Sequence, residues 1–238
     1  MNSRSAIIAC LVASLLYASQ GSAGGVVIDK IYHPYVTPGE QEMEWRGVFQ
    51  NRQPGMPDDL WLHRLSYGRS INNHWFLDFY LVGEKSDDSD FDLTGYEFEA
   101  RRQLTEQGEF WADWGLLFEI EKEANEDAWA FSTGVLIEKE WGRWSSTANL
   151  FLIHEWGSDV SNDWEGRLGL QLRYRYSRAF EPAIEFYSGK HTRGIGPAML
   201  GQFTVGKGRQ VSWEAGVIFG LDNKSPDRSL RFSLEFEF

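Results

Sequence analysis

Three things are scarce in this chain of 238 residues: cysteine, long apolar runs and positive charge. The single cysteine, Cys10, cannot form an internal disulfide, so packing and backbone pairing must hold the fold together. Beyond residue 23 no apolar run approaches the roughly 20 residues of a membrane helix, which excludes a helical membrane protein. Lys and Arg number 23 against 35 Asp and Glu, and this acidic balance argues against a nucleic-acid binder, which needs a basic face.

Aromatic residues, by contrast, are abundant: the chain holds 11 Trp, 9 Tyr and 16 Phe. Disorder is excluded, because so many aromatic side chains would remain in contact with water. The combination of many aromatics with no apolar run is what decides the fold class.

The first 23 residues are expected to be a signal peptide and not part of the fold. Arg4 supplies a positive charge, and the apolar stretch from Ala6 to Ala18 is too short to span a bilayer. Gly21-Ser22-Ala23 then offers the small residues that a signal peptidase reads, so we expect cleavage before Gly24.

The rest of the chain alternates between apolar and polar residues. In the last segment the even positions from Leu230 to Phe238 are Leu or Phe, whereas the odd positions are Arg, Ser or Glu. This period of two is that of a β-strand, because a helix would repeat its apolar residues every three to four positions. Segments with this pattern, separated by Gly, Asn, Asp, Pro or Ser, are predicted to be twelve strands: 41–51, 60–68, 74–84, 93–104, 108–122, 127–141, 144–156, 163–176, 180–190, 198–207, 210–222 and 228–238.

The connections between these segments favour a membrane barrel. Tight turns such as Gly142-Arg143 are expected on one rim, and longer polar loops such as 53–59 and 85–90 on the other. Strands of this length cross a membrane only if the sheet closes, because an open edge leaves backbone groups unpaired in lipid. The sequence therefore predicts an all-β fold: a closed antiparallel transmembrane β-barrel of about 12 strands, with short periplasmic turns and longer extracellular loops.

Tryptophan and tyrosine are expected to form two girdles at the membrane boundaries. Those near the short-turn rim are Tyr67, Trp75, Trp141, Trp144, Tyr174, Tyr176 and Trp213. Those near the opposite rim are Trp61, Trp129, Trp156 and Trp164. The alternative is a water-soluble β-sandwich or lipocalin-like barrel, in which the apolar face would point inward.

The chain resembles the β-barrels of the Gram-negative outer membrane, a porin-like class, over its whole length after residue 23. The resemblance rests on the signal peptide, the twelve alternating strands, the girdles and the terminal stretch Leu234-Glu235-Phe236-Glu237-Phe238. It implies an outer-membrane location, with the lipid bilayer and lipopolysaccharide as surroundings. It also implies that Phe236 and Phe238 form the signal read by the barrel-assembly machinery.

In such a barrel the polar face lines the lumen. Strands three to six carry mostly acids on this face, whereas strand eight presents an arginine ladder of Arg167, Arg173 and Arg175. Opposed walls of this kind orient charged solutes in a narrow channel. The predicted pore-lining residues are Arg46, Arg64, Asp78, Glu97, Glu99, Arg101, Asp113, Glu119, Glu138, Arg167, Arg173, Arg175 and Glu185.

The same charges could instead pair with one another and fill the lumen. A turn at Ser177-Arg178-Ala179 places Arg175 opposite Glu181 as a cross-strand partner, while Arg173 could reach Glu181 or Glu185 only diagonally. Bulky side chains are also expected to narrow the bore: Phe76, Tyr80, Trp111, Phe151 and Ile153. Residues 24–40, in which Pro34 and Pro38 prevent a long strand, could hang in the periplasm or fold into the lumen as a plug, and both interpretations stay open.

No catalytic or metal-ligating residue and no cofactor is predicted. The histidines are scattered without metal-ligand spacing. The nearest candidate for the catalytic residues of an outer-membrane lipid hydrolase is His154 with Ser158 or Ser161 and Asp159. The sequence around His154 lacks the local motif of such enzymes. The acidic loops could hold divalent cations, but the simpler interpretation is that their charges are solvated.

The sequence thus predicts a narrow passive outer-membrane channel for small polar or charged solutes. Twelve strands about 4.8 Å apart and tilted by about 40° give a backbone cylinder roughly 24 Å across, which leaves a channel of about 5–10 Å between the side chains. The alternative is a non-conducting structural or binding barrel with a plugged lumen, and a distant third is a lipid-modifying enzyme.

Overall fold

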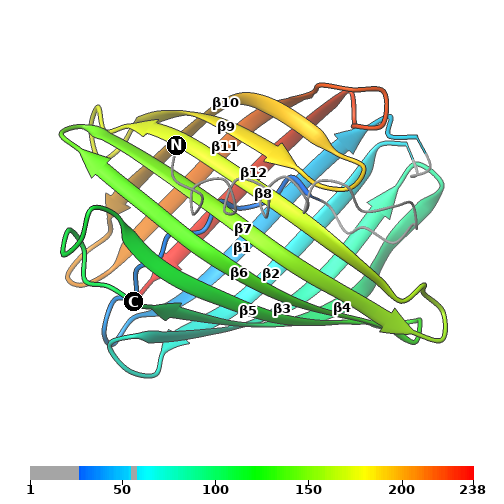
Figure 1. The fold of residues 1–238 in the computed structure, drawn as a ribbon, viewed down its shortest axis with the longest axis horizontal. Coiled ribbons are helices and arrows are strands. Elements are labelled where there is room, and N and C mark those ends of the chain that lie inside the picture. Colours follow the sequence, from blue (N-terminus) through cyan, green and yellow to red (C-terminus); the bar gives the residue numbers. More distant parts are fainter. Residues whose placement is uncertain (1–26, 55–57) are drawn as a thin grey trace, which may run out of the picture.

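The computed structural model describes residues 27–54 and 58–238, so the predicted signal peptide lies outside the described residues. The chain forms a closed antiparallel barrel of twelve strands, in which each strand pairs with its neighbours in sequence and β1 pairs with β12 (Figure 1). The predicted fold class is therefore confirmed. The strands are β1 (Gln41–Asn51), β2 (Leu60–Ser70), β3 (Trp75–Ser86), β4 (Ser89–Gln103), β5 (Asp113–Glu123), β6 (Ala128–Trp141), β7 (Trp144–Gly157), β8 (Asp163–Tyr174), β9 (Glu181–Ser188), β10 (Arg193–Thr204), β11 (Gln210–Gly220) and β12 (Arg228–Glu237).

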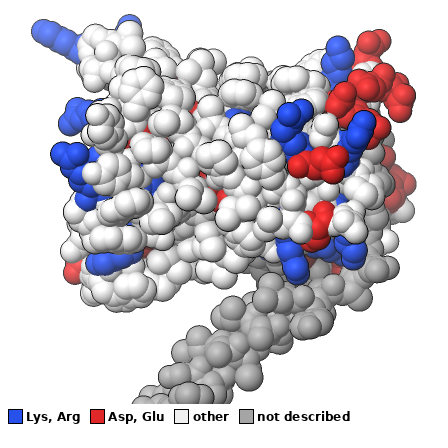
Figure 2. Space-filling model, turned by 90° about the horizontal axis from the view of Figure 1, so that it is seen from above, with Lys and Arg blue, Asp and Glu red and all other residues white. Residues whose placement is uncertain are grey.

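The barrel is apolar outside and polar inside. Leu65 and Phe79 on the outer face are both 48% exposed, whereas Glu138 and Glu185 on the inner face are fully buried. Charged residues gather toward the two ends of the barrel, and a broad uncharged band separates them (Figure 2). Within the described residues no helix is long and apolar enough to span a membrane. A water-soluble barrel with its apolar face inward is the wrong description, because here the apolar side chains face outward.

The two rims differ less than the sequence predicts. The connection 104–112, on the rim that carries the C-terminus, is longer than any connection on the opposite rim. The polar segment 85–90, predicted as a loop, instead extends the β3–β4 hairpin, and the hydroxyls of Ser86 and Ser89 lie 2.9 Å apart at its tip. A polar hairpin can project beyond the membrane as a paired strand, since its polar side chains remain in water.

Two strands, β5 and β10, begin five residues away from their predicted starts. Strand β5 begins at Asp113, so Trp111 lies before it and is 68% exposed, with its ring against Trp114. The prediction that Trp111 narrows the bore is therefore wrong. Strand β10 begins at Arg193 and continues through Pro197, which keeps its register with β9 and interrupts the pairing with β11. Proline has no N–H to donate, and this explains why the ladder breaks on one side only.

Aromatic rings lie near both ends of the strands. Trp129 and Trp156 stack with centroids 6.4 Å apart near one rim, and Trp144 packs on Tyr174 at 4.9 Å near the other. Phe236 and Phe238, the predicted assembly signal, stack at 5.6 Å at the end of β12. The backbone N–H of Phe238 donates to the carbonyl of Gln41, so the closing seam continues to the last residue.

Candidate functional site in the barrel interior

The predicted pore-lining residues all belong to the inner face of the barrel. Most are buried, and the remainder are half-buried along two internal cavities described below. The buried group is Arg46, Asp78, Glu97, Glu99, Asp113, Glu138 and Glu185. The half-buried group is Arg64, Arg101, Glu119, Arg167, Arg173 and Arg175. The inner face is thus a set of charges held close together, and their partners decide what the interior can do.

Residues 27–40 precede β1 and contact this inner face, except at the exposed residues 37–39. Figure 1 shows this segment in blue, running within the outline of the strands. Ile28 and Ile31 are each 1% exposed and pack with Tyr187 and Ile218, side chains of β9 and β11. The apolar side chains of this segment fill space inside a polar barrel and narrow the bore, and we call residues 27–40 the lumen segment.

Glycines on the barrel wall make room for the lumen segment. A Cβ atom added to Gly115 of β5 would lie 2.9 Å from the Cβ of Pro34, and one added to Gly169 of β8 would lie 2.6 Å from the Cδ1 of Ile31. Real Cβ contacts do not approach this closely, so any larger residue at either position would displace the segment or force it to repack.

The carboxylate of Asp29 joins the lumen segment to two arginines of the wall. It lies 2.8 Å from the Nη1 of Arg46 and 3.5 Å from the Nη1 of Arg64. Burial alone would raise the pKa of Asp29, but Arg46 and Arg64 outweigh it and hold that pKa below its ordinary value. Arg64 also donates to Glu97 at 2.9 Å. Two of the predicted pore-lining arginines are therefore neutralised by neighbouring acids.

Tyr32 is the most extensively bonded residue of the lumen segment. The side chain of Asn149 on β7 accepts from the Tyr32 backbone N–H at 2.7 Å and donates to its carbonyl at 2.8 Å. The Tyr32 hydroxyl donates to Glu99 at 2.5 Å and accepts from Arg46 at 3.0 Å. Its ring meets Phe151 edge to face, with centroids 6.2 Å apart. Every polar group of this buried tyrosine therefore has a partner.

The arginine ladder of β8 is paired rather than free. Arg173 lies 3.4 Å from Glu138 and 3.2 Å from Glu181. Arg175 pairs with Glu140 of β6 and not with Glu181, so its predicted cross-strand partner is wrong. The predicted register itself is confirmed, because Arg173 stands opposite Ala183. The Arg175 side chain reaches backward over β7, a contact that the register of neighbouring strands does not reveal.

Arg167, the third rung of the ladder, pairs within its own strand with Glu165 at 3.0 Å. Across the barrel, Arg231 of β12 holds Glu185 by an Nε–Oε2 bond of 2.6 Å and Glu214 at 2.7 Å. Gln171 also donates to Glu185, at 2.8 Å. The interior is thus organised as several ion-pair networks and not as two opposed walls of unpaired charge.

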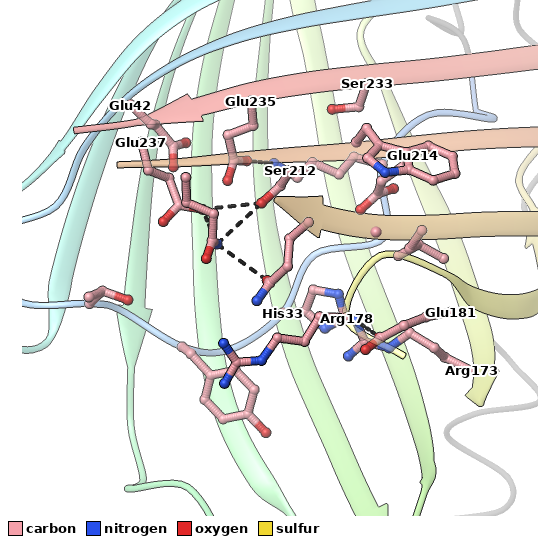
Figure 3. A pocket seen from close by; sticks show the side chains of 18 of the residues that line it. His33, Glu42, Arg173, Arg178, Glu181, Ser212, Glu214, Ser233, Glu235 and Glu237 are labelled. Carbon is pink, nitrogen blue, oxygen red and sulfur yellow. Dashed lines mark hydrogen bonds and ion pairs between the residues drawn. The ribbon is translucent and has the colours of Figure 1, made fainter. Parts of the chain in front are cut away.

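The larger cavity, which we call the chamber, has a volume of about 630 Å³ and lies at the end of the barrel that carries the C-terminus. Figure 3 shows glutamates from β1, β11 and β12 on one side, including Glu42, Glu235 and Glu237, with His33, Arg173 and Arg178 on the other. The acidic side therefore comes from the first and last strands, and not from β3–β6 as the sequence predicts.

A second cavity of about 70 Å³ lies deeper in the barrel and is lined by Arg64, Glu119, Glu121 and Arg167 together with the lumen segment. Lys30 lines both cavities, so it lies between them. Its ammonium bonds Glu44 at 2.9 Å and Glu235 at 3.1 Å. Burial would lower the pKa of Lys30, but Glu44 and Glu235 raise it well above its ordinary value, so this side chain is a fixed positive charge.

Of the two positions that the sequence left open for residues 24–40, the structure shows the lumen for the described part from residue 27, and what sequence reasoning missed is how this segment bonds to the wall. The stretch from Lys30 to Val36 mixes charged, aromatic and apolar residues, and this density of bonding groups was the available signal. His33 bonds Glu138 at 2.5 Å and Tyr35 donates to Asp113 at 2.7 Å. Two of the predicted pore-lining acids thus have a partner in the lumen segment, and Glu138 is bonded by Arg173 of β8 as well.

On the outer face, His154 does not form the pair that a lipid hydrolase would need. Its Nε2 lies 2.7 Å from the Oδ1 of Asn162, and its ring is stacked between Trp156 and Trp164, at 5.4 and 4.4 Å. Among the described residues no hydrogen bond joins it to Ser158 or Ser161. This arrangement gives no activated serine.

No protein-family model matches the chain, and no curated protein matches it. Solved structures do match. An outer-membrane channel from Pseudomonas putida F1 is 12% identical, with a TM-score of 0.58, over 88% of this chain and 98% of that one. The KdgM porin is 12% identical, with a TM-score of 0.52, over 83% and 98%.

The β domain of the Bordetella autotransporter BrkA is 13% identical, with a TM-score of 0.51, over 84% of this chain and 98% of that domain. At such identities the likeness establishes the fold: this chain has the architecture of outer-membrane porins and channels. Because an autotransporter domain shares it, the function must be argued from the interior.

Proposed function

We propose that this protein is a narrow passive channel of the bacterial outer membrane, admitting small polar or charged solutes by diffusion. The observation that carries the proposal is the charged chamber of about 630 Å³ inside a closed barrel with an apolar exterior. Such a barrel belongs in a bilayer, because its outward Leu and Phe side chains need lipid and its inward charges need water. The fold shared with porins supports this function.

The lumen segment sets the bore in this proposal. It crosses the interior between the chamber and the second cavity, and its bonds to Asn149, Glu99 and Arg46 hold it there. Solutes pass only through the space beside this segment, which restricts passage to small ions and molecules. The wall around it carries charges of both signs. The channel therefore discriminates among solutes by their pairing with individual wall charges and not by a single net charge of the lumen.

The KdgM porin has been solved in complex with disordered oligogalacturonate, a polyanion. A polyanion would meet Glu42, Glu235 and Glu237 in the chamber of this chain. We therefore propose small solutes rather than acidic oligosaccharides for this barrel.

A second candidate is a closed barrel with a structural or binding role. The observation that favours it is the completeness of the bonding between the lumen segment and the wall, together with a central cavity of only about 70 Å³. In this case the segment is a permanent plug.

We also propose that lipopolysaccharide surrounds the loop rim and that the assembly machinery reads Phe236 and Phe238.

Planar-bilayer recordings separate the two candidates. Protein refolded from residues 24–238 should give small discrete conductance steps, and protein beginning at residue 37 should give steps several-fold larger, because the lumen segment no longer narrows the bore. Recordings in which the form beginning at residue 24 does not conduct would refute the channel and leave the closed barrel, and conductance by the form beginning at residue 37 alone would identify the segment as its plug. Equal steps from both forms would refute the role of the segment.

A further inference from the structure

The seam that closes the barrel places like charges side by side. In the register of β1 with β12, Glu42 stands opposite Glu237 and Glu44 stands opposite Glu235. All four side chains belong to the inner face, and like charges directly opposite each other destabilise a strand pair. The seam therefore needs positive charge at two successive positions.

The inner pair has its positive charge. The ammonium of Lys30 lies 2.9 Å from Glu44 and 3.1 Å from Glu235, so one cation bridges the two strands. Ser233 also donates to Glu44, at 2.8 Å. The lumen segment thus supplies the cation that this part of the seam requires.

The outer pair has no such partner. Glu42 is only 2% exposed, yet no hydrogen bond or ion pair joins its carboxylate to any residue in the described part of the chain. Glu237 accepts from the Gln210 amide at 2.9 Å and the Ser212 hydroxyl at 3.2 Å, neither of which carries charge. Both glutamates line the chamber, so the unpartnered carboxylate of Glu42 is directed into it.

Further acids converge on the same place. One carboxylate oxygen each from Glu40, Glu42 and Glu235 lies within 4.8 Å of the others. Asp78 Oδ1, buried and without a partner among the described residues, leans over Gly68, the residue that stands opposite Glu42 on β2. Arg101 lines the chamber as well, but its guanidinium lies over the Phe76 ring at 4.9 Å and makes no ion pair within 4.0 Å of a described acid.

A second cluster of three glutamates shows the contrast. Glu97, Glu99 and Glu119 also bring their oxygens together, but Arg64 lies 2.9 Å from Glu97 and Arg46 lies 3.5 Å from Glu99. That cluster is balanced by arginines of the wall. The cluster at the seam has one bonded cation, Lys30, which is shared with Glu44, while Arg101 lines the same chamber and forms no ion pair within 4.0 Å among the described residues.

We propose that Glu40, Glu42 and Glu235 bind one divalent cation, Ca²⁺, at the chamber end of the seam. The donors are all carboxylate oxygens, which hard cations prefer, and Ca²⁺ tolerates the irregular geometry of a site assembled from two strands and the residue before β1. Water in the chamber completes the six to eight oxygen ligands that Ca²⁺ takes. The cation would reduce the repulsion within the outer pair, Glu42 and Glu237, as Lys30 does within the inner pair, Glu44 and Glu235.

Such an ion would tie together β1, β12 and the end of the lumen segment, since Glu40 directly precedes β1. It would therefore stabilise closure of the barrel and remove net negative charge from the chamber. Binding requires no flow of solute, so this inference stands or fails independently of the channel.

The test is a calorimetric titration of CaCl₂ into the refolded mature chain in detergent, after treatment with EDTA. The wild type should bind one ion at this site, and Glu42→Gln should weaken that binding at least about tenfold, because it removes the central charged ligand. Glu181→Gln, on the arginine side of the same chamber, is the matched control and should bind as the wild type does.

Thermal unfolding gives a second readout, because the melting temperatures of the wild type and of Glu42→Gln should respond differently to EDTA and to CaCl₂. In EDTA, Glu42→Gln should unfold at a higher temperature than the wild type, because it relieves repulsion from Glu237, and CaCl₂ should raise the melting temperature of the wild type only. A wild type that binds no Ca²⁺ at millimolar concentration holds a shared proton at Glu42 instead, and the proposal fails. Unchanged binding by Glu42→Gln would place the ion in the acidic loops and also overturn it. If Glu42→Gln does not refold, Glu40→Gln is judged by the same titration.

Discussion

Replacing Asn149 with leucine should release the lumen segment. The Asn149 amide bonds both the N–H and the carbonyl of Tyr32, at 2.7 and 2.8 Å, and leucine has the same branched shape but no polar atom. Each hydrogen bond contributes about 1 kcal/mol net. Losing both shifts the equilibrium toward the released segment by about 2 kcal/mol, which is about 30-fold at RT of about 0.59 kcal/mol.

The shift can be read from the reactivity of one cysteine. The chain has no cysteine other than Cys10, so Ile31→Cys provides a single thiol in the refolded chain that begins at residue 24. Ile31 is 1% exposed, and a thiol at this position reacts with a maleimide only while the segment is out of the lumen. The labelling rate is then proportional to the released fraction, so Asn149→Leu should accelerate labelling about 30-fold.

Thr147→Val is the matched control for this measurement. Thr147 belongs to the same face of β7 and is 1% exposed, but its hydroxyl has no partner among the described residues. Its replacement should leave the labelling rate unchanged. A rate for Asn149→Leu within twofold of its parent would refute the reasoning, and so would a parent that labels as fast as an exposed thiol.

Three further predictions concern the same interior. Changing Arg167, Arg173 and Arg175 to alanine should move the permeability ratio in bilayers toward cations, since their partner acids lose their counter-charges; an unchanged ratio would remove the arginines from selectivity. Gly115→Ala should speed labelling at Ile31→Cys about fivefold or more, because overpacking of about 1–3 kcal/mol falls on the rigid Pro34 ring. The lowered pKa of Asp29 means that its link to the wall is complete above its ordinary value of 3.8 and is lost as the pH falls through the lowered value. The part of the pH dependence of the conductance steps that Asp29→Asn abolishes should therefore lie below about pH 4.

The charges of the interior could be predicted, but their partners could not. Parity along a strand tells which side chains face inward, because successive side chains alternate between the two faces. Parity pairs Arg175 with Glu181 only if each inward charge is assumed to bond a residue of the adjacent strand. In the structure Arg175 passes over β7 to reach Glu140, and long side chains commonly reach beyond the adjacent strand inside a curved sheet.

The sequence by itself determined the barrel: the number of strands, their approximate limits and the direction of their apolar faces. These follow from an alternation that is local, because the period of two is a property of each extended segment, and a sheet that is apolar outside must close in a membrane.

Only the tertiary structure decided where the lumen segment lies and which charges it meets. Tyr32 bonds Asn149 across 117 positions of the chain, and Lys30 bonds Glu235 across 205. Contacts of this range exist only after closure has brought β12 beside β1, since no local period encodes them. The same closure sets Glu42 against Glu237 and creates a need for positive charge that neither strand has alone.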